Sequence, residues 1–179
     1  MSNAPSSRVA IVDYGMGNLF SVGQACERAG LRTVVASSTQ EILAADAVIL
    51  PGVGAFGDAM ETLTRLDLVS CLRDIASSPK PLVGICLGMQ LLMTESHEFG
   101  SHRGLGIIEG EVVSLKVSVD GTRVLKVPQV GWNQIDAMGS DAHENNTEVS
   151  NEPWESPLLE GLSDGEYMYF VHSYYPDPV

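Results

Sequence analysis

The sequence has no long apolar run, only three cysteines among 179 residues, and no lysine or arginine after Lys126. Its apolar stretches are interrupted by glycine and proline and fall short of the roughly 18 to 20 residues that cross a bilayer, so no membrane segment is predicted. The region after Lys126 carries ten aspartates and glutamates, and the whole chain has a net charge of −13. Such a surface repels phosphate backbones, so nucleic acid is excluded as a partner.

The cysteines, Cys26, Cys71 and Cys86, form no even-numbered framework and lack the spacing of metal ligands. Unpaired thiols suit a reducing compartment, and the N-terminus has no basic and apolar secretory signal, so we expect a cytoplasmic protein. We expect neither a metal nor a cofactor. The length predicts one domain over residues 1–179, large enough to bury its own core.

Strand-like and helix-like segments alternate through the first half of the chain. The predicted strands are Arg8–Asp13, Thr33–Ala36, Ala47–Leu50 and Leu82–Ile85; the predicted helices are Asn18–Gly30, Thr39–Ala45, Asp58–Leu66, Leu68–Ala76 and one that starts after Cys86. This alternation predicts an α/β fold with a mostly parallel sheet flanked by helices.

Beyond Gly104 the pattern changes to strands without helices between them. The predicted strands are Gly106–Leu115, Thr122–Val127, Trp132–Ile135 and Tyr167–Val171, with a polar loop over most of Asp136–Ser163. Consecutive strands of this kind predict a small antiparallel extension of the sheet.

The strongest chemical signal is the turn Gly84-Ile85-Cys86-Leu87-Gly88, between a predicted strand and a predicted helix. It is typical of a nucleophile elbow with cysteine in place of serine. The glycines permit the sharp turn, which forces Cys86 into strained dihedral angles and exposes it at a helix N-terminus, where thiolate is favoured. The simpler interpretation, a buried structural cysteine, suits Cys26 and Cys71, which lie within predicted helices.

A second glycine-rich segment, Leu50–Phe56, also follows a predicted parallel strand. Alone it could be an ordinary turn. Beside an elbow, its backbone amides and that of Leu87 can form an oxyanion hole, and we favour this interpretation.

Five segments in order carry a family resemblance: Asp13–Asn18, Leu50–Phe56, Gly84–Leu92, Lys126–Asn133 and Tyr169–Tyr175. Together they resemble the class I glutamine amidotransferases, and in particular the histidine-biosynthesis branch, the glutaminase subunits of imidazole glycerol phosphate synthase. The chain departs from that branch at Gln129-Val130, where His-Met is usual, which affects the partner surface more than the chemistry.

The resemblance implies that Cys86 attacks the side-chain amide of glutamine, forms a thioester, and releases ammonia to a cyclase partner in a heterodimer. It assigns oxyanion amides to Leu87 and to Gly52, Val53 and Gly54. It further implies two sets of contacts: Gln90, Val171, Ser173 and Tyr174 for the substrate, and Asn18, Trp132 and Asn133 for the partner.

A nucleophilic cysteine also needs a general base, commonly histidine. We interpret His97, His102 and His143 as solvated surface residues and His172 as a pocket or core residue, because the family takes its base from a later His-x-Glu pair. The sequence therefore predicts either a fragment of a longer chain or a form that does not turn over glutamine alone. A structural module, a regulatory subunit, a glutaminase for another synthase, and His172 as a substitute base remain alternatives.

Overall fold

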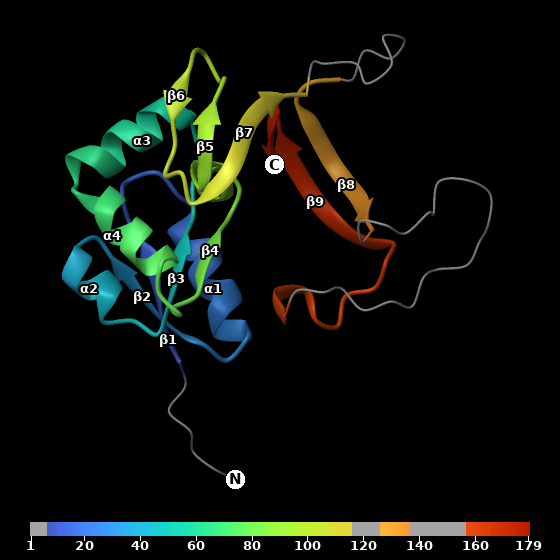
Figure 1. Cartoon of the computed structure of the whole chain (residues 1–179). Coiled ribbons are helices and arrows are strands. Elements are labelled where there is room, and N and C mark those ends of the chain that lie inside the picture. The colour runs from blue at the N-terminus through green and yellow to red at the C-terminus, as the bar shows by residue number, and fades with distance from the viewer. Residues whose placement is uncertain (1–6, 116–125, 137–156) are drawn as a thin grey trace. The chain divides into compact units, whose positions relative to one another are not determined.

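A computed structural model describes residues 7–115, 126–136 and 157–179. The chain divides into two units: an α/β unit, Met1–Ser114 with Tyr174–Val179, and a ribbon unit, Leu115–Ser173 (Figure 1). His143, most of the predicted strand Thr122–Val127 and most of the predicted loop lie outside the described residues.

The centre of the α/β unit is a parallel sheet of four strands in the order β2-β1-β3-β4. Its strands are β1 (Arg8–Val12), β2 (Arg32–Ala36), β3 (Ala47–Leu50) and β4 (Leu82–Gly84). The alternation in the sequence therefore predicted the right elements and the right strand direction. Because β3 and β4 are neighbours, with Leu50 in register with Gly84, their carboxyl ends lie side by side.

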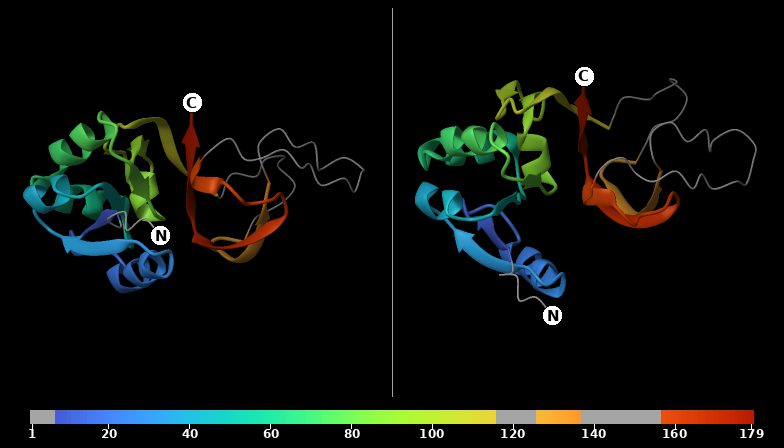
Figure 2. Two further views of the ribbon diagram at one scale, coloured as in Figure 1. Left: turned by 90° about the horizontal axis from the view of Figure 1, so that it is seen from below. Right: turned by 60° about the horizontal axis from the view of Figure 1, so that its bottom comes forward.

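Five helices connect these strands and lead out of the last: α1 (Leu19–Arg28), α2 (Thr39–Leu43), α3 (Phe56–Arg65), α4 (Leu68–Ala76) and α5 (Leu87–Leu91). Asn18 caps α1 by accepting a hydrogen bond from the Ser21 amide, and Gly30, with φ of 78°, follows its end. Figures 1 and 2 show α1 on one face of the parallel sheet and α2, α3 and α4 on the other.

A second sheet of the α/β unit has the strand order β10-β7-β5-β6. It consists of β5 (Met93–Ser96), β6 (His102–Arg103), β7 (Ile108–Ser114) and β10 (Tyr174–Pro178). The sequence predicted β7 but missed the other three. β5 directly follows the short α5, and β10 contains two prolines, so neither has the pattern of an ordinary strand.

The ribbon unit contains an antiparallel pair, β8 (Gln129–Ile135) and β9 (Glu166–His172), and a short 3₁₀ helix, Pro157–Leu159. The predicted strands Trp132–Ile135 and Tyr167–Val171 are confirmed and are longer than expected. The strand predicted over Thr122–Val127 is wrong at Lys126 and Val127, which precede Pro128 and belong to no strand.

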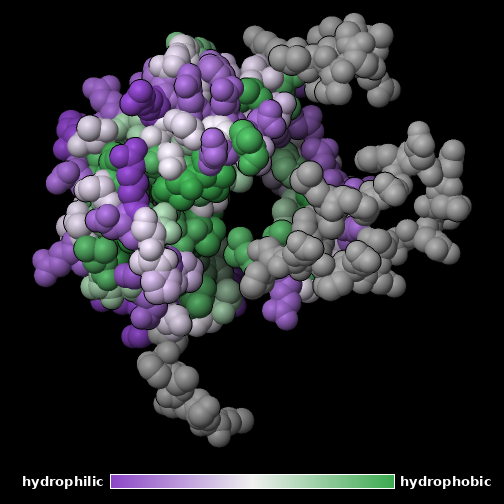
Figure 3. Space-filling model, in the orientation of Figure 1, coloured by the Kyte–Doolittle hydropathy of each residue, from purple (hydrophilic) through white to green (hydrophobic). Residues whose placement is uncertain are grey.

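The core of the α/β unit lies between its sheets and helices and includes the fully buried side chains of Leu50, Phe56, Leu63, Leu72 and Leu91. Hydrophilic residues cover much of the outer surface of this unit in Figure 3, and hydrophobic residues appear in the middle of the face shown. Within the described ranges, no helix is long and apolar enough to cross a membrane.

Candidate active site

Cys86 occupies the turn between β4 and α5 and is exposed. Its φ of 55° and ψ of −118° place a non-glycine residue in strained backbone space, as is common at functional sites. The turn is tight because a methyl group on Gly84 would overlap the backbone of Met89, and one on Gly88 would overlap the carbonyl group of Leu50. The geometry predicted for a nucleophile elbow is therefore present.

The loop after β3 packs directly against this elbow. A methyl group on Gly52 would lie 2.8 Å from both the Gly88 nitrogen and the Leu87 Cβ. The Ile85 amide donates a hydrogen bond of 3.0 Å to the Leu50 carbonyl, which joins the two strand ends. The structure thus brings together Gly52 and Leu87, two of the residues predicted to supply oxyanion amides.

The backbone amides of the elbow and of the loop differ in whether they already donate a hydrogen bond within the protein. Leu87 begins α5, so its N–H has no acceptor within the helix and is available to a ligand. In contrast, the Val53 amide donates to the Met16 carbonyl at 3.3 Å, and a methyl group on Gly54, whose φ is 108°, would meet the end of Met16 at 2.9 Å. The segment between β1 and α1 therefore holds the loop from one side.

Tyr14 lies beneath the same loop and was not singled out from the sequence. Its side chain is buried, and its hydroxyl donates a hydrogen bond of 2.9 Å to the Pro51 carbonyl. Burial raises the pKa of Tyr14, and the negative charge of a Cys86 thiolate raises it further. This tyrosine is therefore a neutral hydrogen-bond donor near Cys86.

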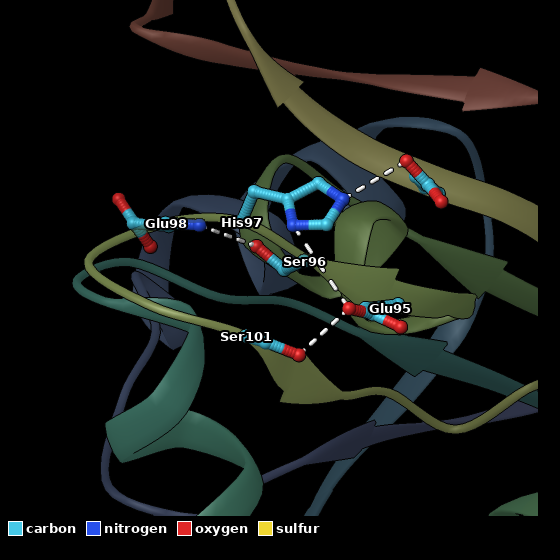
Figure 4. Close-up of polar contacts among 6 residues, drawn as sticks. Glu95, Ser96, His97, Glu98 and Ser101 are labelled. Carbon is cyan, nitrogen blue, oxygen red and sulfur yellow. Dashed lines mark hydrogen bonds and ion pairs between the residues drawn. The ribbon is translucent and has the colours of Figure 1, made fainter.

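Glu98 holds the loop at its other end, where it runs into α3. The N-cap residue of α3, Ala55, has no side chain that can accept from the helix amides, and instead the Glu98 carboxylate accepts from the Phe56 amide at 2.7 Å. The Glu98 amide in turn donates to the buried Ser96 hydroxyl at 3.2 Å (Figure 4). No local sequence pattern indicates this contact, because 42 residues separate its partners.

Gln90 and Tyr174, both predicted to contact the substrate, also meet in the structure. Gln90 lies on α5, one helical turn beyond Cys86, and its side-chain amide donates to the Tyr174 carbonyl at 3.1 Å. Tyr174 begins β10 and packs partly buried against the core. The hydrogen bond fixes the orientation of the Gln90 amide group.

Comparison with known proteins gives the family. The model of the class I glutamine amidotransferase family matches residues 10–179. The chain belongs to this family. It is 46% identical over 171 residues to imidazole glycerol phosphate synthase subunit HisH of Aquifex aeolicus, covering 93% of this chain and 71% of that protein. It is 45% identical over 169 residues to the same subunit of Bacillus subtilis, covering 94% of this chain and 72% of that protein. It therefore belongs to the HisH family within the class.

A solved structure supports the fold. A crystal structure of a glutamine amidotransferase superposes with a TM-score of 0.59 at 17% sequence identity, covering 73% of this chain. The chain spans 65% of the length of that solved chain. The likeness confirms the predicted α/β architecture of this glutamine amidotransferase.

The other residues predicted to contact the substrate or the partner are divided between the two units. Asn18, in the α/β unit, caps α1. In the ribbon unit the Trp132 side chain is 66% exposed and its ring lies 5.5 Å from that of Tyr169, while the Asn133 side chain accepts from Gln129 at 3.3 Å. Val171 is exposed, and the Ser173 carbonyl accepts from the Leu115 amide at 3.0 Å.

The described histidines have different surroundings. His97 is exposed, as predicted, but its ring lies 2.9 Å from a carboxylate oxygen of Glu111 and 3.9 Å from one of Glu95 (Figure 4). His102 lies partly buried on β6, where its ring would meet a methyl group placed on Gly57. His172 ends β9 and its ring lies 5.8 Å from that of Phe170. Its predicted structural role stays a prediction.

The two other cysteines differ from Cys86 in the way predicted. Cys26, on α1, and Cys71, on α4, are buried, and burial raises the pKa of both thiols. A raised pKa lowers the thiolate fraction at neutral pH, so these cysteines are poor nucleophiles.

Proposed function

We propose that this glutamine amidotransferase hydrolyses glutamine to glutamate and ammonia with Cys86 as its nucleophile. The observation that carries the proposal is the strained, exposed elbow of Cys86, with the glycine loop after β3 packed against the start of α5. Family membership supports it independently. Neither Cys26 nor Cys71 has comparable surroundings.

The chemistry proceeds in two stages. The Cys86 thiolate attacks the side-chain amide carbon of glutamine, and the carbonyl electrons move to the oxygen, which becomes an oxyanion. The carbon–nitrogen bond then breaks as the nitrogen takes up a proton, so that ammonia leaves and a thioester remains. Water attacks the thioester through a second oxyanion, and glutamate leaves as the thiol is restored.

We assign the stabilisation of both oxyanions to the amides of Leu87, Gly52, Val53 and Gly54. Preorganised donors of this kind contribute about 10²- to 10³-fold each to acyl-transfer rates. Since the Val53 amide donates to the Met16 carbonyl, that hydrogen bond must open before Val53 can donate to an oxyanion. Leu87 needs no such change, because its amide has no acceptor within α5.

Substrate recognition is assigned to Gln90 and Tyr174, which are linked by a hydrogen bond, and to Val171 and Ser173, largely through their backbones. We propose none of the described histidines as the general base that takes the thiol proton. The resemblance implies a His-x-Glu pair, and none of the four histidines of this sequence is followed two residues later by glutamate.

The relatives' names, as subunits of imidazole glycerol phosphate synthase, support a further step. We propose that the ammonia passes to the cyclase subunit of that synthase, in the histidine-biosynthesis pathway and in the cytoplasm. Trp132 and Tyr169 are register partners, so their side chains share one face of the β8–β9 ribbon, and both are more than half exposed. We assign partner docking to this face. Asn133, which follows Trp132 on β8 and faces the other side of the ribbon, and Asn18, in the α/β unit, are proposed as separate partner contacts on the ground of the resemblance.

The experiment that tests the nucleophile is labelling with a glutamine analogue that carries a reactive chloroketone. We expect one adduct, at Cys86, which excess glutamine suppresses, and no adduct at Cys26 or Cys71. Cys86→Ser is the matched control and should remain unlabelled. An adduct located by mass spectrometry on a buried cysteine, with Cys86 free, would contradict the assignment.

A further inference from the structure

The Tyr14 side chain lies where three parts of the active-site region meet: the end of β1, the loop after β3, and the start of α5. Only 3% of its surface is exposed, and its hydroxyl donates to the Pro51 carbonyl at 2.9 Å. The same hydroxyl oxygen would lie 2.7 Å from a methyl group on Gly52. The Tyr14 hydroxyl therefore bonds the Pro51 carbonyl and fills the space beside Gly52 where a side chain would lie.

The hydrogen bond to the Pro51 carbonyl also determines the orientation of the Gly52 N–H. The Pro51–Gly52 peptide is trans, and in a planar trans peptide the carbonyl and the following N–H point in opposite directions. When a donor holds the Pro51 oxygen, the rotation of the whole plane is fixed, and with it the direction of the Gly52 N–H. Gly52 is one of the residues to which the oxyanion has been assigned.

The loop depends on such an external contact because of its composition. Gly52 has no side chain that could restrain its own dihedral angles, and the next glycine, Gly54, has a φ of 108°. A methyl group on Gly52, which would stiffen the backbone, has no room between Tyr14 and Leu87. The restraint has to come from a neighbouring element, and the Tyr14 hydroxyl supplies it.

We infer that Tyr14 is a positioning residue for the glutaminase reaction: its hydroxyl holds the Pro51–Gly52 peptide so that the Gly52 N–H is oriented for the oxyanion formed at Cys86. The inference rests on the proposed function, because it requires Cys86 to act through an oxyanion. Tyr14 does not contact the reacting atoms in this role; it acts through Gly52. Its raised pKa is consistent with this, because the phenol keeps its proton at neutral pH.

The test compares Tyr14→Phe, which removes only the hydroxyl, with Tyr175→Phe, the same change on the exposed side of β10. The glutamine chloroketone measures labelling at Cys86, because its carbonyl oxygen enters the oxyanion hole. Tyr14→Phe should lower the maximal labelling rate on the order of 10-fold, less than the loss of a direct oxyanion donor. The analogue concentration for half-maximal rate and the rate with iodoacetamide, which needs no oxyanion hole, should not change. Tyr175→Phe should match the wild type in all three.

The outcomes separate this inference from the proposed function. If the wild-type chain is not labelled at Cys86, the proposed function fails. If the wild type is labelled and Tyr14→Phe reacts at the same maximal rate, or differs only in the half-maximal concentration, the positioning role is overturned. If Tyr14→Phe does not fold, a measurement on the wild-type protein still tests the inference. In protein whose tyrosines carry an isotope label at the hydroxyl-bearing ring carbon, NMR should show slow solvent exchange of the Tyr14 hydroxyl hydrogen. Fast exchange would also overturn the inference.

Discussion

The two units of this chain use their apolar residues in opposite ways. The α/β unit places its large apolar side chains inside, and Phe56, Leu63 and Leu72 have no exposed surface. In the described part of the ribbon unit no residue is fully buried, and Trp132, Tyr167 and Tyr169 are each more than half exposed. The α/β unit thus has its own source of stability, whereas the aromatic side chains of the ribbon are available for contacts with another molecule.

The largest expected effect concerns the elbow. Gly88→Ala places a methyl group on the Leu50 carbonyl, so the turn cannot form without moving β3 away from α5. We expect a loss of stability above about 4 kcal/mol, or loss of Cys86 labelling of more than about 100-fold if the chain still folds. Chemical denaturation and chloroketone labelling measure these two results.

Gly23→Ala is the matched control, because the nearest atom to its new methyl group is 3.8 Å away and it lies within α1. This substitution should stabilise the chain by about 0.5 to 1 kcal/mol. If Gly88→Ala behaves like Gly23→Ala, the tight packing of the elbow against Leu50 is not real.

A core substitution and a ribbon substitution test the comparison between the units directly. Leu72→Ala leaves a cavity in the α/β core and should lower the free energy of unfolding by about 2 to 5 kcal/mol. Trp132→Ala, on the exposed ribbon face, should cost less than about 1 kcal/mol in the isolated chain. In contrast, it should weaken binding to the proposed cyclase partner at least about tenfold, because this aromatic side chain is proposed to lie in the interface.

Urea denaturation and calorimetric titration with the cyclase measure the two quantities. Leu158→Ala, a substitution of another exposed apolar residue of the ribbon unit, is the control for binding. Equal loss of binding in Trp132→Ala and Leu158→Ala would show that the aromatic face is not the docking surface.

The decline in stability at alkaline pH should include a contribution from the buried phenol of Tyr14 in the α/β unit. The pKa of Tyr14 is raised in the fold above its unfolded value near 10, so its contribution to stability is fully present below about pH 10. It is lost as the pH rises further, because the unfolded chain releases the proton first. Urea denaturation at pH values between about 8 and 11 measures this loss. Above about pH 10 the free energy of unfolding should decline less for Tyr14→Phe than for the wild type. Parallel declines would mean that the phenol is not buried as described.

The smallest effect is expected at His97. Its contacts with Glu111 and Glu95 lie at the surface, where an ion pair contributes about 0 to 1 kcal/mol. His97→Ala should therefore change the free energy of unfolding by less than about 1 kcal/mol, and should leave Cys86 labelling unchanged. A larger loss of labelling would show that this histidine contributes to the active site after all.

The sequence predicted the parts of the fold that are encoded locally. Asn18 and Gly30 mark the ends of α1, and Gly84, Cys86 and Gly88 mark the elbow, because caps and turns depend on neighbouring residues. β10 was missed because Pro176 and Pro178 argue against a strand, yet at the edge of its sheet a strand tolerates residues without an N–H. Tyr14 and Glu98 were missed for another reason: their hydrogen bonds span 37 and 42 residues, and no local pattern reports such contacts.

The pairing of β7 with β10 has a consequence for how this architecture can vary. Ser114 and Tyr174 are register partners in that pair, so the chain leaves the α/β unit and returns to it at adjacent positions. A segment with such closely spaced ends can be lengthened, shortened or exchanged with little demand on the sheet that receives it. Hybrid proteins that take residues 115–173 from a relative, but keep Val171 and Ser173, should exchange the ribbon face proposed for the partner while the proposed substrate contacts are retained.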